Sequence, residues 1–251
     1  TMKKLFLALF IFVSFLPGLV FAESIKNFEA EYNLPQSAVI EVKETITYDF
    51  GNDYRHGIYR FIPYKYSLDD GGTHRINLDN FSVEDEDGRN YEYEKYSQNN
   101  NVVLKMGDTD RTISGIHTYV IEYKVKGGIR YFEDGDEFFW NVNGLGWKVP
   151  VENISATVTV PGSVGKSDIK TACWAGGYGS TTECNAKSTS GVVSTFSQSG
   201  LGINEGLTID VGVPAGTFEV IDAGFMGSGV SDTVIGFMVL SALGIIIFTF
   251  I

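Results

Sequence analysis

The sequence predicts an all-β protein, an antiparallel β-sandwich of the immunoglobulin-like or a related type. Short segments in which apolar and polar residues alternate recur about every 8–12 residues through most of the chain. Gly is abundant (29 residues) and Pro is scarce (6 residues), a composition that suits many strands joined by tight turns. Between the two chain ends no segment shows a long 3.6-residue apolar period, so little helix is expected there.

The two ends of the chain predict export and membrane anchoring. Residues 2–22 combine two lysines, an apolar run and a small-residue exit, as in a signal peptide that is cleaved before Glu23. Residues 234–251 form 18 residues without a charge, near the lower limit for a membrane-spanning helix, and a Gly/Ser-rich linker at 223–233 precedes them. The alternatives are an uncleaved N-terminal helix and a buried C-terminal helix. Because no basic residue follows the apolar run, we expect the sequence to be truncated inside or just after the helix.

Residues 23–222 are expected to form the extracytoplasmic sandwich, either as one unit or as two subdomains that meet near 151–153. The strands predicted from alternation are, in chain order, 24–34, 37–50, 75–83, 91–96, 102–106, 115–125, 137–142, 154–160, 211–214 and 217–221. The strand at 115–125 (GIHTYVIEYKV) has the clearest pattern. In the strand at 37–50, Glu44 is an exception because it falls on the face that otherwise carries apolar residues such as Ile46.

Charge and cysteine content narrow the classes of partner. The formal net charge is −12, which argues against nucleic acid and against charge-driven docking on anionic lipid, although acidity also keeps an exported domain soluble. Cys173 and Cys184 are the only cysteines. In an exported chain they are expected to form a disulfide that closes a short loop, with free thiols as the alternative. No His lies near either cysteine, so no metal site is predicted there.

Some segments resemble known functional motifs but lack a required residue. Residues 161–167 (PGSVGKS) resemble a phosphate-binding loop, but Val160 stands where the first glycine is needed. The acidic turn at 85–88 resembles a calcium loop, but Val83 occupies the first ligand position. A second acidic loop at 133–137 keeps a calcium-binding site at the surface as an alternative. The chain has three His residues and no Gly-x-Ser-x-Gly motif, so neither a catalytic set nor a cofactor is predicted.

Two segments contain the candidate recognition residues. Residues 55–60 (RHGIYR) place two guanidinium groups, an imidazole and a tyrosine in an acidic protein, and guanidinium groups match carboxylates, phosphates and sugar acids. Residues 138–147 place two tryptophans around a Gly-rich bend. The candidate ligand-binding residues are Arg55, His56, Tyr59, Arg60, Trp140, Asn141 and Trp147. The alternative is a structural role, with the arginines paired internally and the tryptophans filling the core.

Several of these runs together resemble a known family. The runs EVKETITYDF and RHGIYRFIP, then TYVIEYKVKGGI, then DGDEFFWNVNGLGWKVPVENISATVTVP and the loop between Cys173 and Cys184 resemble the DUF2207 family of predicted bacterial membrane proteins. The resemblance covers 22–221 and implies an exported β-rich domain followed by a membrane helix. Family members usually continue into a cytoplasmic region with further membrane helices. The family has no established catalytic residues, so the resemblance assigns no role to individual side chains.

The function predicted from the sequence is that of a binding or scaffolding module. It would be anchored in the bacterial cell membrane, with its body on the extracytoplasmic side, and would bind an envelope glycan or a protein partner without catalysing a reaction. The first alternative is a hydrolase or transferase that acts on envelope polysaccharide, which needs two carboxylates roughly 5–10 Å apart in an aromatic-lined cleft. The second alternative is a structural spacer in a membrane complex.

Overall fold

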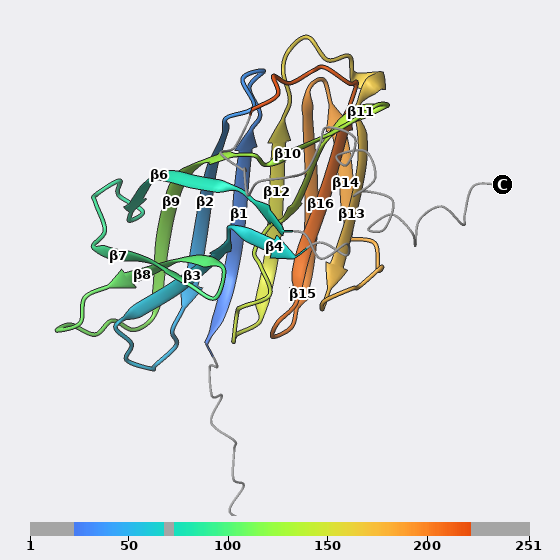
Figure 1. The fold of residues 1–251 in the computed structure, drawn as a ribbon. Coiled ribbons are helices and arrows are strands. Elements are labelled where there is room, and N and C mark those ends of the chain that lie inside the picture. Colours follow the sequence, from blue (N-terminus) through green and yellow to red (C-terminus); the bar gives the residue numbers. More distant parts are fainter. Residues whose placement is uncertain (1–22, 68–72, 222–251) are drawn as a thin grey trace, which may run out of the picture.

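The large sheet of the sandwich has seven strands and is mixed. The computed structural model describes residues 23–67 and 73–221, so the predicted signal peptide, linker and membrane helix lie outside the described residues (Figure 1). The sheet order is β14-β15-β12-β1-β2-β9-β6. The bounds of these strands are β1 Ser24–Asn33, β2 Ile40–Asp49, β6 Asn77–Glu84, β9 Ile116–Lys126, β12 Val151–Thr159, β14 Ala186–Ser190 and β15 Val193–Leu201. Within the two described ranges, no helix is long and apolar enough to cross a membrane.

The expectation of a purely antiparallel sandwich is wrong at one position, because β1 and β12 pair in parallel, from Ile25 opposite Val151 to Asn33 opposite Thr159. The strand pairs on either side, β1 with β2 and β12 with β15, are antiparallel. A hairpin can join only antiparallel neighbours, whereas parallel strands need a long connection. Here β2 to β11 lie between the two strands in the sequence, so the chain returns to the same end of the sheet before β12 begins.

Two smaller sheets share one face of the large sheet. The four-stranded sheet has the order β10-β11-β16-β13, and the three-stranded sheet has the order β3-β8-β7, with a separate pair β4-β5. Their bounds are β3 Gly57–Pro63, β4 Lys65–Ser67, β5 Thr73–Arg75, β7 Tyr93–Gln98, β8 Asn101–Gly107, β10 Ile129–Phe132, β11 Gly135–Asn141, β13 Lys170–Gly176 and β16 Gly206–Val213. A single 3-10 turn, Lys166–Asp168, precedes β13 in the described part of the chain.

The core lies between the large sheet and the two smaller ones. The ring of Phe138 on β11 packs on that of Tyr32 on β1 at 5.2 Å between centroids, and Arg60 of β3 reaches Glu44 of β2. The core is formed by apolar and aromatic residues at alternate positions of the strands. In β9, for example, the buried residues are Tyr119, Ile121, Tyr123 and Val125. The described chain is therefore all-β and consistent with a sandwich of two layers (Figure 1).

The predicted strands at 24–34, 37–50 and 115–125 agree closely with β1, β2 and β9. The predicted strands do not include β3, β4, β10, β13, β14 and β15. For β14 and β15 the reason is that their Ser- and Thr-rich segments lack a clear apolar alternation. The predicted strand at 217–221 is not a strand. It is held instead by single hydrogen bonds, such as the one that the backbone N–H of Phe218 donates to Asp136 at 3.0 Å. The predicted break near 151–153 lies inside β12, which pairs with a strand on each side.

Candidate functional site

The alternation of β3 divides the first predicted recognition segment between the core and the surface. Ile58, Arg60 and Ile62 face the core, whereas Tyr59 faces outward and is 46% exposed. The Arg60 side chain is only 2% exposed, and it projects toward Glu44, which is 0% exposed. The Glu44 that breaks the apolar pattern of β2 therefore meets an arginine that breaks the same pattern in β3.

All five N–H donors of Arg60 are used inside the protein. Nε and Nη2 donate to the two carboxylate oxygens of Glu44 at 2.7 and 2.8 Å. Nη1 and Nη2 also donate to three backbone carbonyls, those of Phe61, Asn143 and Val142, at 2.9, 2.7 and 2.9 Å. The hydroxyl of Tyr123 donates to Glu44 at 2.8 Å. We call Arg60, Glu44 and Tyr123 the arginine node; it ties β3 to β2, β9 and the bend that follows β11.

Within the arginine node, the charge of Arg60 is balanced by the carboxylate of Glu44. Burial acts to lower the pKa of the Arg60 guanidinium, but the Glu44 carboxylate outweighs it and raises the pKa above the ordinary value. Burial and the neighbouring Glu44 likewise raise the pKa of the Tyr123 phenol well above its usual range. A charge that is buried with its partner and with every donor bonded is stable in place, so no N–H of Arg60 is left for a ligand.

The second predicted segment forms the bend that receives Arg60. Nε1 of Trp147 donates to the carbonyl of Asn143 at 2.9 Å, and the Asn143 amide bonds Glu205 and Leu207 of the β16 end. The Trp140 ring stacks on Phe138 at 5.7 Å. Trp140 and Trp147 are 5% and 8% exposed, so both fill the core. Contact with a ligand stays a prediction for the exposed candidate residues Arg55, His56 and Tyr59.

Arg55 and His56 lie at one end of the sandwich and join its loops. Arg55 pairs with Glu23 at 2.6 Å and with Asp53 at 3.0 Å, and its side chain is 51% exposed. Nδ1 of His56 lies 3.0 and 3.1 Å from the carbonyl oxygens of Asp108 and Arg111. Since both partners are acceptors, this nitrogen carries the proton and donates to them. Cys173 and Cys184 form the expected disulfide.

A carboxyl pair that the sequence did not indicate lies on the outer face of the four-stranded sheet. Burial, then the charge of Glu137 and a hydrogen bond with it, raise the pKa of Asp210 to about 8. Glu137 also pairs with Arg130, whose guanidinium lies 4.5 Å from the centre of the Phe139 ring. Carboxyl groups in direct hydrogen-bonding contact do not leave the gap of about 5–9.5 Å that glycoside hydrolysis requires.

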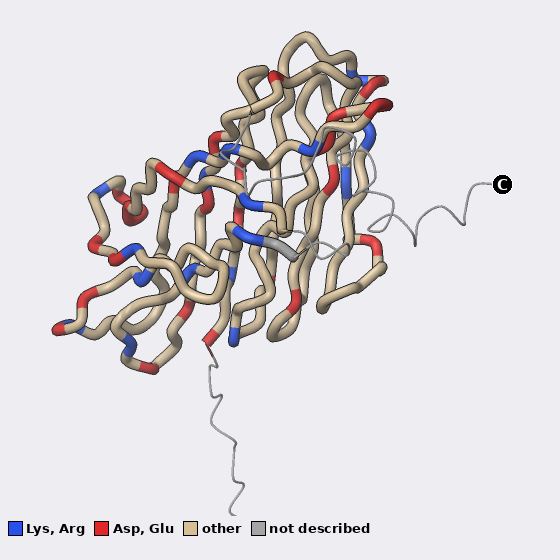
Figure 2. The backbone as a smooth tube through the Cα atoms, in the orientation of Figure 1, with Lys and Arg blue, Asp and Glu red and all other residues tan. Residues whose placement is uncertain are grey.

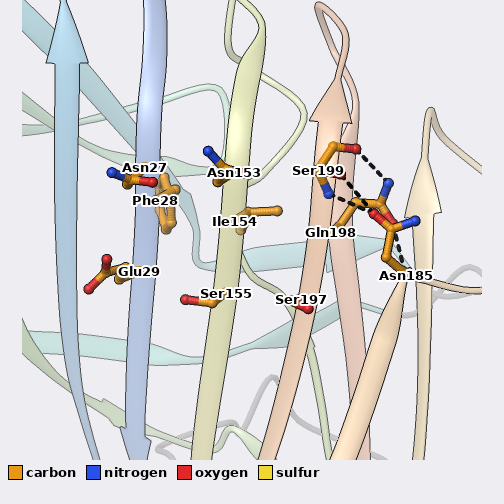
Figure 3. Close-up of a pocket in the computed structure, with 10 residues that line it drawn as sticks. All are labelled: Asn27, Phe28, Glu29, Asn153, Ile154, Ser155, Asn185, Ser197, Gln198 and Ser199. Atoms are coloured by element: carbon orange, nitrogen blue, oxygen red, sulfur yellow. Dashed lines mark hydrogen bonds between the residues drawn. The ribbon is translucent and has the colours of Figure 1, made fainter.

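A polar groove with a volume of about 260 Å³ lies on the outer face of the large sheet (Figure 3). Its floor consists of Ser155 on β12 and Ser197 on β15. Asn27 and Glu29 on β1 form one wall. We call this hollow the outer groove. The opposite wall holds Asn185, Gln198 and Ser199, which hydrogen-bond to one another.

A shared irregularity in three strands creates the outer groove. In β12, Val151 and Ile154 are buried, so two residues in succession, Glu152 and Asn153, face outward. The pairs of successive exposed or half-exposed residues at the same level are Lys26-Asn27 on β1 and Ser199-Gly200 on β15. The register between β1 and β2 shifts at this level, between Ile25 and Asn27, and a bulge of this kind bends a strand and redirects its side chains. Two polar residues between apolar ones, as in VENI, are the signal by which sequence reasoning could have found this site.

One of the comparisons with known proteins identifies the family of this chain. The N-terminal domain of the DUF2207 family, described as a predicted membrane protein, matches residues 24–213. The structure is similar to native leukotriene A4 hydrolase from Saccharomyces cerevisiae, with 8% identity and a TM-score of 0.47 over 76% of this chain and 29% of that one. It is also similar to an M1 zinc metallopeptidase from Deinococcus radiodurans, with 8% identity and a TM-score of 0.38 over 74% of this chain and 42% of that one.

These likenesses carry no functional argument, since identity and TM-score are both low. The chain spans less than half the length of either enzyme. A search of curated protein sequences finds no match.

Proposed function

The chain belongs to the DUF2207 family of predicted membrane proteins, and from this premise we propose that it is a membrane-anchored binding module. Its body, on the extracytoplasmic side, binds a component of the bacterial cell envelope and catalyses no reaction. The outer groove carries the proposal, because it is an open hollow of about 260 Å³ on a sheet face, lined by polar side chains from three strands. Concave sites with a few convergent polar groups are where proteins bind small ligands or segments of polymers.

Two observations support the extracytoplasmic side. Residues 2–22 have the pattern of an export signal. The Cys173–Cys184 disulfide closes the loop between β13 and β14, and disulfides persist in oxidising compartments outside the cytoplasm. The anchor is the apolar segment 234–251, whose 18 uncharged residues suit a membrane span.

The proposed test measures binding to envelope material when the groove is filled. The full chain in detergent micelles is sedimented with purified bacterial envelope fragments. Ser197→Tyr places a large side chain on the groove floor and should abolish most of the co-sedimentation. Thr195→Tyr is the matched control, because Thr195 is exposed on the same face of β15, two residues away and outside the groove.

Each outcome has a defined meaning. Binding that Ser197→Tyr loses and Thr195→Tyr keeps supports a recognition module with its site in the outer groove. If both variants bind like the unaltered chain, the site lies elsewhere, and Arg55, His56 and Tyr59 become the surface to test. If the unaltered chain binds no envelope material, the proposed function fails and the structural spacer takes its place. Release of soluble sugar from the fragments would favour the hydrolase.

A further inference from the structure

We propose that the outer groove binds an uncharged glycan strand, which lies on the face formed by β1, β12 and β15. The inference deepens the proposed function and rests on it. Four properties of the groove carry it: the hydrogen-bonding groups that stand free, the preformed wall, the sign of the charge and the position within the sheet.

The groove presents both hydrogen-bond donors and hydrogen-bond acceptors that have no partner among the described residues. Among the described residues, the side chains of Asn27, Ser155 and Ser197 make no hydrogen bond. The amide of Asn153 donates to the carbonyl of Lys26 at 3.2 Å, which leaves its oxygen as an acceptor. Hydroxyl and amide groups donate and accept alike, so the groove suits a ligand that does the same. Sugar rings with hydroxyl and acetamido substituents have that character.

The wall on the β15 side is already ordered. The Asn185 carboxamide oxygen accepts from the backbone N–H and the hydroxyl of Ser199 at 2.9 and 3.1 Å. The Gln198 oxygen accepts from the backbone N–H of Asn185 at 2.9 Å, and the Gln198 amide donates to the Ser199 carbonyl at 2.8 Å (Figure 3). A wall that is fixed before binding loses little side-chain freedom when a ligand arrives.

The charge around the groove excludes anionic polymers. Glu29 is the charged residue of the lining, which contains no Lys or Arg. β15 has no charged residue and β12 has Glu152 alone, so both strands are largely tan in Figure 2. Lys26 donates to Glu152 at 2.7 Å and also lies 3.6 Å from Asp49, so the positive charge of this lysine is offset by two carboxylates. With a net charge of −12 over the chain, phosphate or carboxylate polymers meet repulsion here.

The position within the sheet disfavours a peptide. β12 is paired on both sides, with β1 and with β15, so its backbone groups are not free to bond an added strand. Peptides that join a sheet do so at an edge, through main-chain hydrogen bonds. A ligand in the outer groove meets side chains only.

The size of the groove points to one segment of a longer polymer. A volume of about 260 Å³ falls just below the range of about 300–1,000 Å³ for sites that enclose a drug-sized ligand. A few exposed hydrogen bonds without aromatic stacking give weak binding, with a dissociation constant of about 1 mM for a short oligosaccharide. Several copies anchored side by side in a membrane would hold the polymer far more tightly.

The experiment titrates the full chain in detergent micelles with three probes. They are an uncharged hexamer of N-acetylglucosamine, poly(glycerol phosphate) and a Ser/Gly decapeptide. We expect the hexamer alone to bind. Ser155→Tyr, which fills the groove floor, should weaken hexamer binding at least about tenfold. Thr157→Tyr, two residues further along the same face of β12, should change it by less than about twofold.

A charge variant provides a gain of binding. Glu29→Gln removes the charge of the groove lining, weakens the repulsion and should allow poly(glycerol phosphate) to bind, whereas the control Glu31→Gln, outside the groove on the same face of β1, should not. The inference is overturned if the unaltered chain prefers the phosphate polymer or the peptide, or if the two tyrosine variants behave alike. If the chain sediments with envelope fragments but binds no hexamer, the glycan assignment fails and the proposed function stands. If it binds neither, both fail.

Discussion

The arginine node and the outer groove lie on opposite faces of the same sheet and show two uses of polar residues. In the node, charged side chains are fully buried and every donor of Arg60 is bonded. In the groove, short uncharged side chains face solvent, and those of Asn27, Ser155 and Ser197 make no hydrogen bond among the described residues. The charged cluster drew attention in the sequence, yet it serves the fold, whereas the groove is made of serines and asparagines that any surface contains.

The difference follows from the cost of removing charge from water. A buried ion must have its partner and its hydrogen bonds, because an unpaired one would cost several kcal/mol. An exposed hydroxyl or amide is bonded to water and can exchange that water for a ligand at little cost. A buried charged group whose hydrogen bonds are all made within the protein therefore indicates a structural role. Exposed polar side chains that are bonded only to water indicate a binding site. The effect of a replacement on the free energy of unfolding should therefore increase with the burial of the charged side chain that is replaced.

The largest expected effect is that of Arg60→Met. Removal of the guanidinium leaves the Glu44 carboxylate buried without its charge partner, which costs about 3–5 kcal/mol. The free energy of unfolding, measured by urea titration, should fall by that amount, and the melting temperature should fall with it.

The double variant Arg60→Met, Glu44→Leu is the control for this prediction. It removes both charges and should recover a large part of the loss, since an apolar pair of similar volume needs no partner. A loss below about 1 kcal/mol for Arg60→Met alone would show that the node does not stabilise the contact between the sheets.

An intermediate effect is expected for Asp210→Asn, and it depends on pH. In the folded protein Asp210 keeps its proton up to about pH 8, whereas the unfolded chain loses it near 3.8. Between these values the folded state binds more protons, so the free energy of unfolding falls as pH rises from about 4 to about 8. Asn keeps the shape without ionising. The variant should be more stable than the unaltered chain by about 2 kcal/mol at pH 8, and the difference should shrink toward pH 4.

The readout is a set of urea titrations from pH 4 to pH 9 on both proteins. Glu219→Gln, which removes an exposed carboxylate, serves as the control for the loss of one negative charge. Parallel profiles for Asp210→Asn and the unaltered chain would contradict the raised pKa.

The smallest expected effect is that of Arg55→Ala. Its pairs with Glu23 and Asp53 are short, but the arginine is half exposed, and exposed pairs contribute less than about 1 kcal/mol. Glu23 also keeps the hydrogen bond from the Tyr48 hydroxyl at 2.6 Å. Urea titration at low and at high salt should show a small loss that disappears in about 1 M NaCl. A loss as large as that of Arg60→Met would contradict the ranking by burial.

Much of the fold could be predicted from local pattern, whereas the local signal for the outer groove is limited to the two successive polar residues Glu152 and Asn153 in β12. The exceptional Glu44 was visible in the sequence, and so was Arg60 between Ile58 and Ile62, but nothing local shows that the two side chains meet. The outer groove needs three strands, β1, β12 and β15, whose order follows from long-range pairing. The parallel pair β1-β12 escaped prediction for the same reason.

The sequence by itself determined the all-β class, the positions of β1, β2 and β9, the Cys173–Cys184 pair and the family. Each depends on the period of the apolar residues or on the order of motifs along the chain, which are properties of neighbouring residues. The tertiary structure alone decided that Arg60 and Trp147 are buried, that Asp210 lies against Glu137, and that a groove opens over Ser155. These depend on which strands become neighbours, because burial and the surrounding charges determine what a polar side chain does.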